Sequence, residues 1–143
     1  FGSALSHIQR LETICDKPVI RSIPEAEPIG PKHLTDILVV APCTGNTLAK
    51  LAASITDTTA TMAVKSHLRT GNPVVLAVAT NDALAGSAKN IGQLLNLKHY
   101  RFVPFGQDQP TGKPTSLIAD FTKIPQTLAD ALDGKQQQPI LLS

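Results

Sequence analysis

The fold is decided by one stretch of the sequence, Leu38-Val39-Val40-Ala41-Pro42-Cys43-Thr44-Gly45-Asn46-Thr47-Leu48-Ala49-Lys50. An apolar run ends at Pro42, small and polar residues follow, and a helical pattern begins at once. This order predicts a buried strand, a tight turn and a helix. It is the arrangement in which α/β proteins bind anionic cofactors.

A second copy of the pattern lies downstream. Residues 73–79 form an apolar run, the polar turn Thr80-Asn81-Asp82 follows, and residues 83–97 read as a helix. Ligands of open α/β sheets bind outside the carboxyl ends of the strands. We therefore expect the two turns, each containing an Asn, to build one site.

Strands and helices alternate along the whole chain. Apolar spacing predicts helices over residues 3–15, 46–55, 83–97 and 124–132, and one capped by Asp57 that ends at Leu68 and is closed by Gly71 and Asn72. The predicted strands cover residues 18–23, 36–41, 73–79, 100–104 and 139–142, with proline-rich or polar connections at 24–31 and 105–116. The aliphatic residues of 36–41 do not alternate, as expected where helices cover both faces of a sheet. The fold class is therefore α/β, a three-layer α/β/α fold with a mostly parallel, doubly wound sheet.

Composition narrows the function classes. The 143 residues suit one domain, and with 3% aromatic residues and no Trp its core must be aliphatic. A net charge of +2 with scattered basic residues argues against nucleic acid, and no apolar run is long enough for a membrane span. Two cysteines do not make a disulfide framework, which favours the cytoplasm, and the four His residues lack metal-ligand spacing.

The first turn is the strongest candidate site. Thr44, Gly45, Asn46 and Thr47 offer free backbone N–H groups and hydrogen-bonding side chains at a helix N-terminus, which suits a phosphate, a carboxylate or the polar edge of a flavin. An N-capped helix without a ligand explains the same residues equally well. The turn is neither a GxGxxG nor a Walker loop.

Other candidates surround the second turn and the helices. Asn81 and Asp82 could bind a ligand or cap a helix, and Lys89 could reach an anion or lie in solvent. Cys43 is expected to be a small buried residue rather than a nucleophile. The cluster formed by Lys65, His67 and Arg69 is interpreted as the solvated end of a helix; the alternative is contact with a dicarboxylate or with a partner subunit.

Several motifs carry a family resemblance. Pro42-Cys43-Thr44-Gly45-Asn46-Thr47 resembles the P-A-S-A-N-T motif of the flavin-containing cysteine decarboxylases, which include the phosphopantothenoylcysteine enzymes. The chain is more similar to the B-subunit family of dipicolinate synthases, through residues 73–82, Phe102-Val103-Pro104-Phe105-Gly106-Gln107-Asp108, residues 113–117 and residues 134–136. The Met and Trp of the decarboxylase motif are replaced here by Ala83 and Leu84, and no decarboxylase-style His can be placed.

The resemblance implies a site and a reaction. FMN would be bound by Pro42, Thr44, Gly45, Asn46, Thr47 and Thr80, and a small dicarboxylate substrate by Asn81, Asp82 and Lys89; no catalytic residue is assigned. The implied reaction is the oxidation of dihydrodipicolinate to dipicolinate, in the mother cell of a sporulating bacterium, with NADP bound by the separate A subunit of dipicolinate synthase. The alternatives are a flavin-dependent decarboxylase of the phosphopantothenoylcysteine type and a non-catalytic scaffolding subunit.

The resemblance also implies an assembly. Its members begin with a strand and a G-x-T-G-S turn ahead of the segment that starts here at Phe1, so residues 1–143 are expected to be one N-terminally truncated, flavoprotein-like domain. A trimer-based homo-oligomer is expected, and the candidate contact is the helix from Asp57 to Leu68, which has Met62 and Val64 among its apolar residues. The loop of residues 105–116 is expected to cover the site or join a subunit interface, with a disordered surface loop as the alternative.

Overall fold

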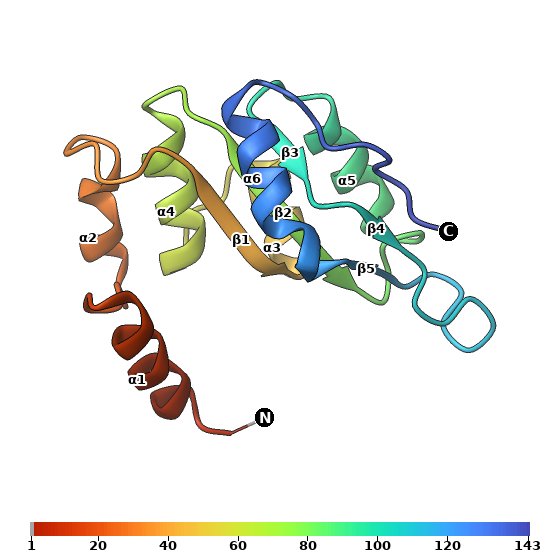
Figure 1. Ribbon diagram of the computed structural model, residues 1–143, viewed down its shortest axis with the longest axis horizontal. Coiled ribbons are helices and arrows are strands. Elements are labelled where there is room, and N and C mark those ends of the chain that lie inside the picture. Colours follow the sequence, from red (N-terminus) through yellow and green to blue (C-terminus); the bar gives the residue numbers. More distant parts are fainter. Residues whose placement is uncertain (1) are drawn as a thin grey trace.

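A mixed five-stranded sheet lies between two layers of helices in the computed structural model, which describes residues 2–143. Helices α3 (Gly45–Ala53) and α5 (Ala88–Leu95) lie on one face of the sheet, and α6 (Ile124–Leu132) lies on the other (Figure 1). The predicted three-layer α/β fold is confirmed.

The centre of the sheet is parallel. β1 (Leu38–Cys43) and β3 (Tyr100–Phe102) pair with opposite edges of β2 (Val74–Thr80), with Val74 opposite both Leu38 and Tyr100. β2 is buried from Val74 to Val78 because it is central. Within the described residues β1 is an edge strand and is half-buried over Leu38–Val40, and these three residues pack against the core.

An antiparallel pair extends this sheet. β5 (Leu117–Ala119) pairs with the end of β2, and β4 (Phe105–Gly106) pairs with β5. The predicted loop therefore begins two residues later than expected, because Phe105 turns its buried side chain into the core and pairs with Ala119. A parallel bridge from Phe105 to Leu141 provides part of the predicted C-terminal edge strand.

Threonine side chains cap the N-terminal ends of two helices. Thr44 caps α3, and Thr58 caps α4 (Thr59–Leu68) in a reciprocal capping box with Thr61. The prediction that Asp57 caps α4 is wrong, because its carboxylate instead forms a 2.9 Å ion pair with Lys50. Gly71 follows α4 at φ +77°, in agreement with the positive φ predicted for this position.

The N-terminal segment differs from the prediction after its first helix. The helix α1 (Ala4–Cys15) is confirmed, and it projects from the rest of the chain (Figure 1). The strand predicted over residues 18–23 is wrong. Ser22 accepts a hydrogen bond from the Glu25 N–H and starts the short helix α2 (Ile23–Ala26), and the 3₁₀ turn η1 (Glu27–Ile29) follows directly.

The helix predicted over residues 83–97 begins only at Ala88. Residues 81–87 form consecutive turns, because the Asp82 carbonyl accepts the N–H groups of both Ala85 and Ser87. At the other end of the chain, the 3₁₀ turn η2 (Phe121–Lys123) leads into α6. Gly134, which has a φ of +73°, follows the C-terminal end of this helix.

Candidate functional site

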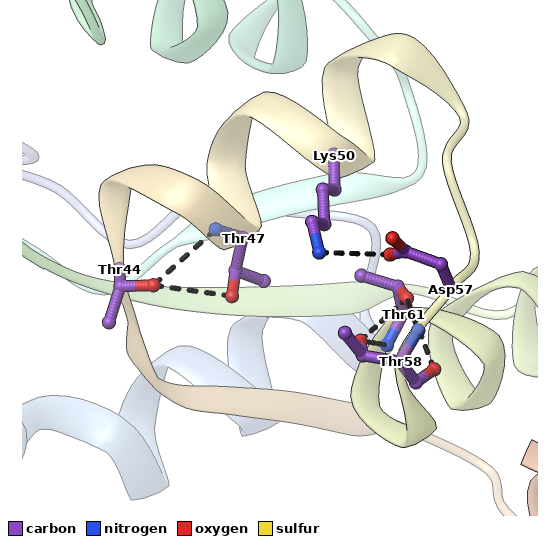
Figure 2. Close-up of polar contacts among 6 residues, drawn as sticks. All are labelled: Thr44, Thr47, Lys50, Asp57, Thr58 and Thr61. Atoms are coloured by element: carbon purple, nitrogen blue, oxygen red, sulfur yellow. Dashed lines mark hydrogen bonds and ion pairs between the residues drawn. The ribbon is translucent and has the colours of Figure 1, made fainter.

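The first turn presents free polar groups at the start of α3. The Thr44 hydroxyl accepts the Thr47 N–H at 3.4 Å and lies 3.3 Å from the Thr47 hydroxyl (Figure 2). Within residues 2–143, the N–H groups of Gly45 and Asn46 and the side-chain amide of Asn46 have no hydrogen-bond partner, and the Asn46 side chain is not fully buried. The turn therefore keeps donors available for a polar or anionic group.

A carboxylate organises the second turn. Asp82 Oδ1 accepts hydrogen bonds from the Thr80 hydroxyl at 2.6 Å and from the Ser87 hydroxyl at 2.8 Å. These two bonds, the one from Thr80 first, hold the pKa of Asp82 below its ordinary value. Asp82 is therefore ionised at neutral pH, and the protons of both hydroxyl groups point at it.

Gly45 joins the two turns. A Cβ atom at Gly45 would lie 2.8 Å from Thr80 Oγ1, 2.9 Å from Asp82 Oδ1 and 2.9 Å from Ser87 Oγ. Only a glycine permits this approach without displacement of the network. The structure brings both turns together in one place, as predicted, and their spacing depends on Gly45.

The loop after β4 is fastened to the second turn. The Thr115 hydroxyl donates to the Asn81 carbonyl at 2.6 Å, and the Leu84 N–H donates to the Thr115 carbonyl at 2.9 Å. A hollow of about 400 Å³ lies between loop and turn, with Asn81, Asp108 and Lys113 in its lining. The loop therefore lies beside Asn81, and its role as a cover of the site stays a prediction.

Polar groups of the loop hold one another. A hydrogen bond from Ser116 holds the pKa of Asp108 below its ordinary value, and the positive charge of Lys113 adds to this. The Gln107 amide donates to the Pro114 carbonyl at 2.8 Å. The loop is thus internally bonded and bears one lysine at the hollow.

The predicted site residues fall into two groups. Pro42, Thr44, Gly45, Asn46 and Thr47 lie in the first turn or directly before it, while Thr80, Asn81 and Asp82 lie in the second. Lys89 is exposed in the first turn of α5 and has no polar contact with either turn in the described part of the chain. Their roles in binding FMN and substrate stay predictions.

The sequence alone does not indicate Ser87 as part of this network. Its position reads as the interior of a helix, whereas it is a buried residue that precedes α5. The one local signal is the presence of Asp82 and Gly86, residue types that favour turns, within the segment read as the start of the helix.

Two other expectations can be compared with the structure. Cys43 is fully buried, and burial raises the pKa of its thiol to about 12, so it is a core residue as predicted. His67 is fully buried, with its ring nitrogens 2.7 Å from the Thr35 hydroxyl and 2.9 Å from the Pro73 carbonyl oxygen. Its assignment to the solvated end of a helix is wrong, because it joins α4 to the segments before β1 and β2.

The residues of the helix expected to make a subunit contact differ in exposure. Val64 is 1% exposed and packs in the core of its own chain, and the helix as a subunit contact stays a prediction. Met62 is half-buried.

Comparison with known protein families assigns the part of the chain that contains both turns. A family model described as Flavoprotein matches residues 3–131, a span that contains both turns. The chain belongs to the flavoprotein family.

Three known proteins match this chain over nine-tenths or more of its length. The B subunit of dipicolinate synthase from Bacillus subtilis (strain 168) is 43% identical over 142 residues, which are 99% of this chain and 71% of the relative. The crystal structure of the corresponding B subunit from Bacillus halodurans C superposes with a TM-score of 0.95 at 43% identity, over 100% of this chain and 73% of that one. The FMN-dependent cysteine decarboxylase SpaF superposes with a TM-score of 0.64 at 25% identity, over 90% of this chain and 73% of its own.

No helix within residues 2–143 of this flavoprotein has the length and apolar character needed to cross a membrane.

Proposed function

We propose that this flavoprotein is the B component of a dipicolinate synthase, which binds FMN at the two turns and takes part in the oxidation of dihydrodipicolinate to dipicolinate. The observation that carries the proposal is the TM-score of 0.95, at 43% identity over the whole chain, to the B subunit of such an enzyme. The proposed partner is the A component of the synthase, which would bind NADP, and the mother cell of a sporulating bacterium is the proposed setting.

The residues of the first turn fit the polar part of a flavin nucleotide. The free N–H groups of Gly45 and Asn46 lie at the positive end of α3, where the helix dipole favours an anionic group. The Asn46 amide and the Thr44 hydroxyl add donors and acceptors beside them. FMN, when bound, would supply the acceptor for a hydride equivalent; this is the chemistry of the cofactor itself.

The second turn and the neighbouring loop offer polar groups that would bind the substrate. Dihydrodipicolinate has two carboxylates and loses a hydride equivalent and a proton when its ring becomes aromatic. Asn81 and Lys113 line the same hollow and could bind a carboxylate by hydrogen bond and by charge. Asp82, which is ionised and already bonded to Thr80 and Ser87, would orient the turn.

FMN binding is tested by titration of the protein followed by flavin fluorescence. Asn46→Leu should weaken binding by about 1–3 kcal/mol, because a polar group of the cofactor loses its partner. Asn96→Leu, at the exposed C-terminal end of α5, is the matched control and should leave the affinity unchanged. Equal affinities in Asn46→Leu and wild type would contradict the assignment.

The reaction is tested with the reconstituted pair of proteins. We expect dipicolinate formation to require both components. The rate should also fall when residues 109–113 are deleted, because the deletion removes Lys113 and, with it, the turn that the hydrogen bond from the Lys113 N–H to the Gln109 carbonyl closes. Folding should survive the deletion, because loop length changes closure entropy only slowly. Activity of the pair without FMN would favour a scaffolding role. CO₂ release from phosphopantothenoylcysteine would favour the decarboxylase alternative.

A further inference from the structure

A groove between α3 and α4 lies apart from the two turns. It encloses about 390 Å³, within the range of small-molecule sites, and none of the residues 42–47 or 80–82 lines it. The exposed surface of its wall is mainly apolar. The aliphatic residues Leu51, Ile55, Val64 and Leu68 line it together with Ser54, Thr56 and Thr61. Apolar spacing along the chain does not reveal such a pocket, because its residues come from separate segments.

Tyr100 adds a polar group to this wall. Its side chain is 7% exposed, yet within residues 2–143 its hydroxyl forms no hydrogen bond, and it is not among the polar atoms sealed from solvent. Tyr100 thus lines the groove and has a hydroxyl that is not sealed from solvent. Burial raises the pKa of Tyr100 to about 12, so the phenol keeps its proton at neutral pH and can donate it to an acceptor.

Cations stand along the rim. Lys65 and Arg69 are four residues apart at the end of α4 and so share one face of the helix. Neither forms an ion pair in the part of the chain that the structure describes, although Glu27 lines a neighbouring groove beside both. Lys50, the third cation of the rim, is already paired with Asp57 (Figure 2).

We propose that this groove binds a small aromatic carboxylate, with its ring against Leu51, Ile55 and Leu68 and its carboxylate between Lys65, Arg69 and the Tyr100 hydroxyl. The apolar wall accounts for the ring, because the walls of ligand sites are mainly apolar with a few polar groups that fix orientation. The two unpaired cations account for the charge, since no carboxylate lines the groove itself. The guanidinium of Arg69 is suited to bidentate contact with a carboxylate.

The test is an NMR titration of the isotope-labelled chain with benzoate and with pyridine-2,6-dicarboxylate, and with neutral benzamide as a control ligand. We expect saturable shifts of the Leu51 and Val64 amide signals with either carboxylate, weaker binding at higher salt, and no saturation with benzamide. Amide signals of residues 44–47 should not move, which separates this groove from the proposed FMN site.

Variants connect the shifts to the residues. Lys65→Gln combined with Arg69→Gln should weaken carboxylate binding by at least about tenfold, because charge-assisted hydrogen bonds are lost. Tyr100→Phe should weaken it to a smaller extent. Lys98→Gln combined with Lys135→Gln removes two exposed charges elsewhere on the surface and should leave the affinity unchanged.

Several results would overturn the proposal. These are the absence of saturable shifts at millimolar carboxylate, equal binding of benzamide, or equal affinity in the Lys65/Arg69 double variant. Shifts of the same amides that depend on protein concentration and not on the added ligand would assign the groove to a second copy of the chain instead. FMN binding of each variant is measured in a separate titration. Carboxylate binding in the groove does not depend on FMN, so a protein that fails to bind FMN would contradict the proposed function and leave the groove test valid.

Discussion

Gly45→Ala is expected to destabilise the protein although alanine is the better helix former. The new Cβ would lie 2.8 Å from Thr80 Oγ1 and 2.9 Å from both Asp82 Oδ1 and Ser87 Oγ, and these atoms are held in place by their own hydrogen bonds. Overpacking of this kind costs about 1–3 kcal/mol, against a gain of up to about 1 kcal/mol from helix propensity. We expect a net loss of about 1–2 kcal/mol, or roughly 3–8 °C in the melting temperature.

The assay is urea and thermal unfolding followed by circular dichroism. Gly92→Ala is the matched control: it lies inside α5 with nothing within 4 Å of the added Cβ, and it should stabilise the protein by about 0.5–1 kcal/mol. Ser87→Ala removes one of the crowded oxygens, so in the Gly45→Ala background it should cost less than it does alone. The reasoning is refuted if Gly45→Ala is as stable as wild type while Gly92→Ala behaves as expected.

Three further predictions concern single interactions. Hydrogen bonds from Thr80 and Ser87 lower the pKa of Asp82 below 3.8, so the ionised carboxylate stabilises the fold above that pH, and this contribution is lost as the pH falls through the folded-state pKa. The difference in urea midpoint between wild type and Asp82→Asn should therefore shrink from neutral pH to about pH 2. A constant difference would contradict this prediction. Thr58→Ala should lower the stability by about 1 kcal/mol through loss of the α4 cap, whereas Asp57→Asn should hardly change the urea midpoint; the reverse order would restore Asp57 as the cap. A thiol reagent at mildly alkaline pH should modify exposed Cys15 in the native protein and Cys43 only after unfolding, and rapid native reaction of Cys43 would show that its thiol is accessible.

Local signals in the sequence are sufficient for the main elements near the site. The aliphatic runs before Thr44 and Thr80 predict β1 and β2, and the small, polar residues after each run predict the turns. These features depend on neighbours within a few residues, through side-chain burial, helix capping and the conformational freedom of Gly71. That both turns meet at one edge follows from the parallel arrangement of the strands.

Tertiary contacts decided the rest. Residues 18–23 have the composition of a strand but no neighbouring strand within the described residues to pair with, so the cap at Ser22 starts a helix instead. The burial of His67 depends on Thr35 and Pro73, and the spacing of the two turns depends on Gly45 meeting a carboxylate that follows another strand.

The groove of Tyr100, Lys65 and Arg69 exists only once α4 and β3 are brought together. Contacts of this kind join residues that are far apart in the chain. They depend on the shape and position of both partners, which local propensities and apolar spacing do not record.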